Sequence, residues 1–149
     1  MGVWLRVGLV SAALLGWLWV SGCRRGLDRE NEQSNLKPLA VFYGRYVAQH
    51  RGQPPADEAQ FKQFLNSINP SELAAFQVNS VESLFVSPRD GKPYVIVYGH
   101  SRQRPAPGAS PVIAYEQEGK GGKRLVANAL GAVEEVDQAR LKQLLPEAK

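Results

Sequence analysis

The spacing of apolar residues changes from a helical period to a strand period near residue 80, and this change restricts the fold most. One helix face, with the spacing i, i+3, i+4, i+7 and i+11, is formed by Leu36, Leu39, Ala40, Tyr43 and Val47. From residue 81 onward, short apolar segments alternate with turn-forming sequences. Helices followed by a run of strands are typical of α+β proteins, in which the helices pack on one sheet.

The first part of the folded region predicts three helices. The first covers 36–49 and ends before a Gly and a Pro-Pro pair. The second covers 57–68, with Asp57 as its N-cap and a Gln at the capping-box position. The third covers 69–76, with Asn69 as its N-cap and a Pro at its first position.

The second part predicts a series of strands joined by tight turns. The expected strands are 81–86, 94–99, 112–116, 124–128 and 132–136. The strand at 94–99 is apolar on both faces, so we expect it in the centre of the sheet. The connections at 87–93 and 117–123 are rich in Gly, Asp and Pro, which favour turns.

A last helix is expected over 137–145, with Asp137 as its N-cap and Pro146 after its end. The pattern therefore predicts one α+β domain over residues 36–146. Its N-terminal helices pack on a four- to five-stranded antiparallel sheet, and a short helix closes the chain. A single domain agrees with a chain of 149 residues.

Residues 1–22 have the three parts of a secretory signal peptide. Arg6 supplies an early positive charge, residues 7–20 carry no charge, and small residues follow at Ser21 and Gly22. A transmembrane helix needs about 20 apolar residues, so this run favours a cleaved signal over a spanning anchor.

The only cysteine follows directly, in Val20-Ser21-Gly22-Cys23, which resembles the lipobox of bacterial lipoproteins. The resemblance implies cleavage after Gly22, diacylglyceration of the Cys23 thiol and acylation of the new N-terminus. Three acyl chains give stable attachment to a lipid bilayer. The alternative is a buried or incidental cysteine. A disulfide within the chain is excluded, because the cysteine has no partner.

The residues after the cysteine predict how the domain is attached. The polar and charged segment 23–35 is expected to be a flexible tether. Arg24 stands where the lipoprotein resemblance would require Asp for retention in the inner membrane. We therefore expect the periplasmic side of a bacterial envelope, with the outer membrane favoured over the inner one.

The segment Ala129-Leu130-Gly131-Ala132-Val133-Glu134, together with the strand-turn-strand before it, resembles the C-terminal sheet of type II secretion pseudopilins and related pilin-like proteins. The resemblance covers residues 81–136. It implies a pilin-like architecture and a structural or interaction role in an envelope protein assembly. Separately, we expect no enzymatic activity. Leu130 and Ala132 replace the Asp and His of the family pattern, and a lipobox replaces the prepilin cleavage site.

Basic residues gather in the connections between the expected strands. This predicted basic rim consists of Arg89, Lys92, Arg102, Arg104, Lys120, Lys123 and Arg124. As an alternative function, the loops 87–93, 100–111 and 117–123 would form a module that binds an anionic envelope ligand. The other interpretation is that these loops are simply solvated and bind no ligand. A net charge of +4 is too low to favour nucleic-acid binding.

Other chemistries have little support. The Gly-rich segment 117–123 lacks the Gly spacing and the Ser or Thr of a phosphate-binding loop, so a hairpin turn is expected. The two histidines, His50 and His100, are far apart, and Ser101 beside His100 does not make a nucleophile and base pair. Five carboxylates could cluster around the last hairpins as a calcium site, but the pattern favours solvated strand ends for them: Glu116, Glu118, Glu134, Glu135 and Asp137. We expect no metal and no cofactor.

Overall fold

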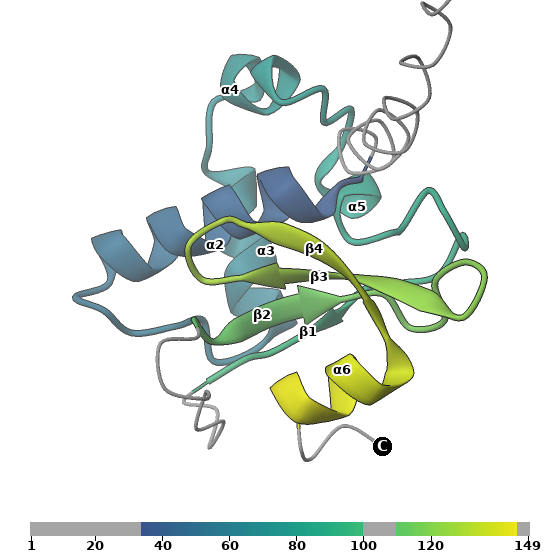
Figure 1. The fold of residues 1–149 in the computed structure, drawn as a ribbon. Helices are drawn as coiled ribbons and strands as arrows, with labels where there is room; N and C mark the ends of the chain where they lie inside the picture. The colour runs from purple at the N-terminus through teal and green to yellow at the C-terminus, as the bar shows by residue number, and fades with distance from the viewer. Residues whose placement is uncertain (1–33, 100–109, 146–149) are drawn as a thin grey trace, which may run out of the picture.

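A four-stranded antiparallel sheet carries helices on both faces in the computed structural model, which describes residues 34–99 and 110–145 (Figure 1). The strands follow one another in the sheet in chain order, so the sheet is a meander. They are β1 (Val95–Ile96), β2 (Val112–Tyr115), β3 (Lys123–Asn128) and β4 (Val133–Asp137). The α+β class and a sheet within the expected range are confirmed.

Four helices form the layer on one face of the sheet. They are α2 (Leu36–Gln49), α3 (Glu58–Asn66), α4 (Pro70–Ala75) and α5 (Val81–Leu84). Helix α2 contacts β2 and β3 directly, and Figure 1 shows it lying across the sheet. The expected N-caps are confirmed, because the Asp57 side chain accepts from the Gln60 amide and Asn69 accepts from the Ser71 amide.

The predicted strand at 81–86 is wrong, because its first four residues form helix α5. A reciprocal capping box begins this helix. The Ser80 hydroxyl accepts from the Ser83 amide at 3.1 Å, and the Ser83 hydroxyl accepts from the Ser80 amide at 3.2 Å. Only Val86, after the helix, makes a bridge, to Pro93. The capping pair outweighs the strand preference of the apolar residues.

The predicted central position of the strand at 94–99 is also wrong. Only Val95 and Ile96 form the strand β1, which pairs with β2 alone and lies at the edge of the sheet. Tyr94 is buried in the core under the helices and Ile96 packs against that core. Val95 and Val97 are half-buried. Apolar residues on both faces of this segment therefore do not mean that a strand pairs with it on each side.

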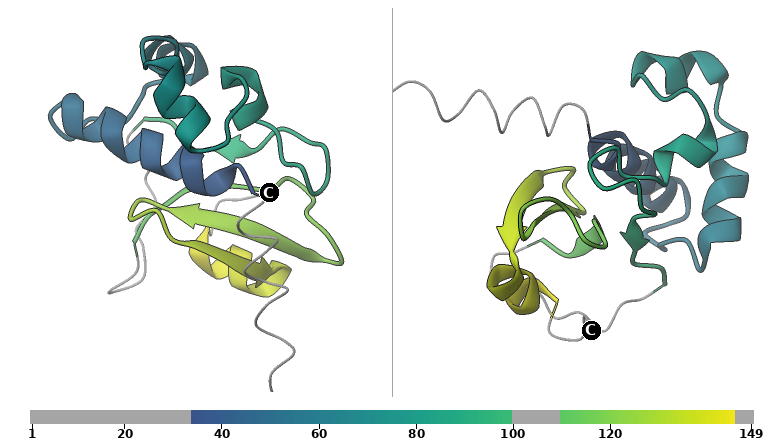
Figure 2. Two further views of the ribbon diagram at one scale, coloured as in Figure 1. Left: turned by 90° about the horizontal axis from the view of Figure 1, so that it is seen from above. Right: turned by 90° about the vertical axis from the view of Figure 1, so that its right-hand side faces the viewer.

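The sheet separates two apolar cores. The larger one lies under the four helices and includes Phe42, Phe61, Leu65 and Leu125. The smaller one lies on the other face, under α6 (Gln138–Leu144), and consists of Val112, Val126, Val136, Leu141 and Leu145. Figure 2 shows α6 on the side of the sheet opposite to α2.

Helix α6 begins as the sequence predicts. The Asp137 side chain accepts from the Arg140 amide at 2.7 Å, which satisfies an amide of the first turn. Pro146 lies outside the described residues. Among residues 34–99 and 110–145, none of the helices has the length and apolar character to cross a bilayer.

The folded domain includes at least two residues of the predicted tether. Ser34 is 3% exposed, and its hydroxyl lies 3.3 Å from the hydroxyl of Tyr94. The Asn35 side chain donates to the carbonyl oxygens of Ser83 at 2.7 Å and Val86 at 3.1 Å. The chain is therefore fixed to the domain before α2 begins.

Candidate functional site at one end of the sheet

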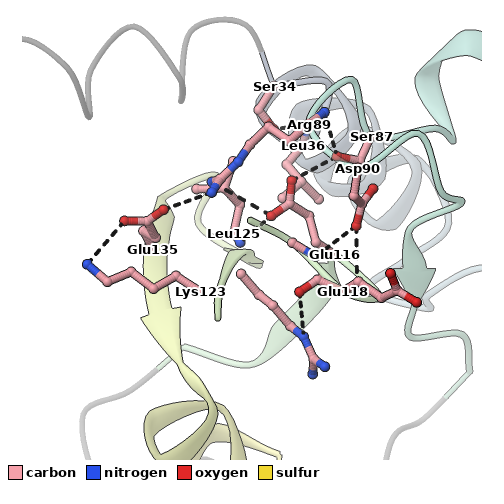
Figure 3. A network of polar contacts seen from close by, with 12 residues as sticks. Ser34, Leu36, Ser87, Arg89, Asp90, Glu116, Glu118, Lys123, Leu125 and Glu135 are labelled. Atoms are coloured by element: carbon pink, nitrogen blue, oxygen red, sulfur yellow. Dashed lines mark hydrogen bonds and ion pairs between the residues drawn. The ribbon is translucent and has the colours of Figure 1, made fainter. Parts of the chain in front are cut away.

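The described part of the predicted basic rim gathers at one end of the sheet. There the 87–93 loop meets the 117–123 hairpin, which brings together Arg89, Lys92, Lys120, Lys123 and Arg124. Figure 3 shows Arg89 and Lys123 of this set beside their carboxylate partners. The other two basic residues of the rim, Arg102 and Arg104, lie outside the described residues, as does Cys23.

The side chain of Asp90 joins the two loops. One carboxylate oxygen accepts from the backbone amides of Gly119 at 2.8 Å and Glu118 at 3.3 Å, and the other accepts from the amide of Lys92 at 3.0 Å. Burial alone would raise the pKa of Asp90, but the backbone hydrogen bonds favour its charged form and lower the pKa overall. Asp90 is therefore a charged link between segments nearly 30 residues apart.

The expected surface position of Arg89 is wrong. Its side chain is only 7% exposed and lies between two carboxylates of the sheet. Nη2 is 2.8 Å from Glu135 Oε1, and Nη1 is 3.7 Å from Glu116 Oε2 (Figure 3). Arg89 is withdrawn from the surface because buried carboxylates need a compensating charge.

The expectation of solvated strand ends is wrong for Glu116, which is 0% exposed. Its Oε1 accepts from the Ser87 hydroxyl, and its Oε2 accepts from the Leu125 amide, both at 2.8 Å. The sequence analysis did not predict the burial of Glu116, although one signal for it was present. Glu116 follows the buried Ala114 by two positions, and residues two apart on a strand point to the same face.

Three other cations of the rim lie near carboxylate or carbonyl oxygens. Lys92 Nζ is 2.5 Å from Glu118 Oε1, and Lys123 Nζ is 3.7 Å from Glu135 Oε2. The Arg124 Nε–H donates to the carbonyl oxygen of Glu118 at 3.4 Å. Five cations thus share this end of the sheet with five carboxylates: Asp90, Glu116, Glu118, Glu135 and Asp137, which is the register partner of Lys123. Such near balance gives little attraction for an anionic polymer.

The Gly-rich connection at 117–123 is a hairpin turn, as expected. Lys120 and Lys123 exchange two backbone hydrogen bonds, and the element that follows is the strand β3. A phosphate-binding loop would instead lead into a helix N-terminus. Within the described part of the chain, no three His, Cys, Asp or Glu side chains are grouped as a metal site would require.

The chemistry that this end of the sheet offers is structural. The Ser87 hydroxyl lies beside the buried carboxylate of Glu116, but Ser87 is fully buried and donates its proton to that carboxylate. A serine without solvent contact cannot reach a substrate. Tyr94 is buried nearby, and this burial raises the pKa of its hydroxyl despite the contact with Ser34. The network therefore joins the loops to the sheet.

No family model, no curated protein and no solved structure matches this chain. The resemblances to bacterial lipoproteins and to pseudopilins rest on the motif residues themselves.

Proposed function

We propose that this protein is an exported lipoprotein, held to a bacterial envelope membrane by acylated Cys23, whose folded domain serves a structural or interaction role. The sequence Val20-Ser21-Gly22-Cys23 carries this proposal. Its Val20 is the last residue of an uncharged run of 14 residues, 7–20, and a signal peptidase site belongs at the end of such a run.

We also propose that the domain has a pilin-like architecture, which the arrangement of α2 supports. This first described helix packs across β2 and β3 of an antiparallel meander. Two apolar side chains left at the surface provide positions at which the interaction role can be tested. Phe76 is 42% exposed at the end of α4, and Leu130 is 82% exposed in the turn between β3 and β4.

The membrane attachment is tested by the intact mass of the protein extracted from membranes. We expect a chain that begins at Cys23 and carries a diacylglyceryl group and an amide-linked acyl chain. The Cys23→Ser variant should lose both the lipid and the membrane fraction. An unmodified chain that begins at Met1 would overturn the attachment.

The interaction role is tested by photo-crosslinking in intact cells. A crosslinking amino acid at Phe76 or Leu130 should give a discrete adduct with another envelope protein. The same amino acid at Lys142, an exposed polar position on α6, is the matched control. If Phe76 and Leu130 give no adduct beyond that of Lys142, the role is contradicted.

A further inference from the structure

A hollow lies at the C-terminal end of α2, where the chain turns into α3. Its volume is about 480 Å³ and it is open to solvent. Its walls are formed by Tyr46, Gln49, His50, Arg51, Gln53, Pro54, Ala56 and Gln60. In Figure 1, this connection lies at the end of α2 opposite to the end where the described chain begins. Fourteen residues of α2 separate the two ends by about 20 Å.

The backbone around the hollow is fixed by hydrogen bonds. The Gly52 amide donates to the Val47 carbonyl at 2.9 Å, and the Gln53 amide donates to the His50 carbonyl at 3.0 Å. The Gly99 amide donates to the carbonyl of the buried Pro55 at 2.8 Å, which ties the connection to the end of the β1 segment. A ligand would therefore meet a largely preformed site, and little ordering would oppose its binding.

Three glutamine side chains dominate the polar lining: Gln49, Gln53 and Gln60. Each amide group offers both donors and acceptors. The Gln60 carbonyl oxygen accepts from the Ala56 amide at 2.7 Å, which directs its NH₂ group away from that bond. His50 Nδ1 lies 2.8 Å from the Tyr46 carbonyl oxygen, so the Nδ1–H donates to that oxygen and Nε2 is not part of the bond.

A flat aromatic pair forms part of the wall. The rings of His50 and Tyr46 are stacked, with centroids 3.8 Å apart and an angle of 5° between their planes. Tyr46 is buried beneath, held edge-on by Phe61 and Phe64, whereas His50 is exposed. The hollow thus combines a rigid flat surface with donors and acceptors at its sides.

The charge of the lining discriminates between ligand classes. Arg51 is a fixed cation, and none of the lining residues is acidic. One cation in an open hollow gives an anion little affinity at physiological ionic strength. Amide groups paired with a flat ring instead match a ligand rich in hydroxyl and amide groups, which needs many donors and acceptors and one apolar face.

We propose that this hollow binds a neutral sugar chain that carries acetamido groups. The inference rests on the proposed function, since an envelope anchor at the N-terminal side leaves the hollow at the far end of the domain, facing polymers of the envelope. Hydroxyls of one sugar ring pair with the glutamine amides, and the ring face lies on His50. The acetamido group of the sugar pairs with the amide of another glutamine, and this contact distinguishes the acetamido sugar chain from a plain glucan.

The test is an NMR titration of the full lipid-bearing chain in detergent micelles, with the glutamine side chains labelled. The probe is the tetramer of N-acetylglucosamine, and maltotetraose is the comparison sugar. We expect the side-chain signals of Gln49, Gln53 and Gln60 to shift, with a dissociation constant in the millimolar range. Maltotetraose should bind more weakly, and added salt should change neither result.

Variants locate the site. Joint Gln49→Ala and Gln53→Ala substitution should weaken binding roughly tenfold, the effect of losing net hydrogen bonds of ordinary strength. Gln63→Ala, an exposed glutamine of α3 outside the lining, is the matched control and should bind as the unaltered chain does.

Several outcomes would overturn the sugar site. They are absence of shifts at the solubility limit of the tetramer, equal weakening in the Gln63 control, and equal binding of maltotetraose. The sugar site and the lipid anchor are tested by independent measurements, so either can be contradicted without the other. The unlipidated Cys23→Ser chain should still bind the tetramer, whereas the mass of the extracted protein reports on the lipid alone.

Discussion

At the residue scale, Arg89 lies between two carboxylates from different parts of the sheet. Glu116 directly follows β2 and is fully buried, while Glu135 lies in the middle of β4. Burying these charges costs solvation free energy, and the fork of Arg89 together with the Ser87 and Leu125 donors offsets that cost. Removing one member leaves its partners buried with unmatched charge.

Glu116→Gln is expected to lower the free energy of unfolding by about 2–3 kcal/mol, because the buried Arg89 then loses the compensating charge of Glu116. Urea denaturation of both chains measures the change. Glu118→Gln is the matched control, because Glu118 pairs with Lys92 at the surface. This substitution should lower the free energy of unfolding by about 0.5 kcal/mol. Equal losses in the two variants would show that Glu116 is not held by the buried network.

Asp90 predicts a pH dependence of stability. Its pKa is lower in the folded protein than the ordinary value of 3.8, so its link between the loops is fully formed above about pH 4. The contribution is lost as the pH falls through the folded-state pKa. Asp90→Asn should therefore be less stable near neutral pH and should lose less stability on acidification. Urea midpoints at about pH 7 and pH 3 test this, and parallel decreases for both chains would contradict it.

Residue-scale features were predictable where the partner is close in sequence. The N-caps Asp57, Asn69 and Asp137 bond to amides two or three residues away, so local pattern suffices to find them. Arg89 and Glu116 are 27 positions apart, and each reads alone as an exposed charge. Their burial depends on the 87–93 loop packing against one end of the sheet, which no local pattern encodes.

At the element scale, the hairpin between β2 and β3 depends on one glycine. Gly119 has φ of +71°, and a Cβ there would lie 2.1 Å from the carbonyl oxygen of Lys123. Gly121 has φ of +61°, but a Cβ there would meet open space. A substitution at Gly121 therefore adds backbone strain alone, whereas one at Gly119 adds backbone strain and a steric clash.

Gly119→Ala should destabilise the fold by about 2–4 kcal/mol, since the turn must rearrange and the Asp90 contact to its amide is lost. Gly121→Ala should cost about 1 kcal/mol, the strain of a left-handed alanine. Thermal unfolding followed by far-UV circular dichroism gives both values. Equal costs would show that the hairpin relieves the clash by moving.

The elements were predictable to the extent that length and caps specify them. The helix over 36–49 has four turns of consistent apolar spacing, and its bounds are confirmed. The segment 81–86 is too short for its period to be informative, and its Ser80–Ser83 capping pair lacks the usual Glu or Gln. Its apolar residues therefore favoured a strand that the protein does not form.

At the scale of the whole molecule, the sheet has one core under α2 and another under α6. Leu39 and Leu141 are almost fully buried, one in each core. Because both cores share β2, β3 and β4, we expect them to unfold together. The order of elements was predictable from the change of period, whereas the placement of α6 on the opposite face depends on packing that the pattern leaves open.

Leu39→Ala and Leu141→Ala should each cost about 2–5 kcal/mol and shift one cooperative transition. The measurement compares far-UV circular dichroism with near-UV tyrosine signals, because all three tryptophans lie in the predicted signal segment. Lys142→Ala, at the exposed position beside Leu141, is the control and should change little. Two separate transitions in Leu141→Ala would show that α6 and its core unfold independently of the helical layer.

The attachment of Ser34 and Asn35 to the domain has a mechanical consequence. A pull applied from the N-terminal side reaches Ser34 and Asn35 first, and their hydrogen bonds pass the force to Tyr94, Ser83 and Val86. The force is thus divided between α5 and the start of β1 before α2 can be drawn from the sheet. A protein held by its lipid anchor in a moving envelope would yield first at these bonds, with the core intact behind them.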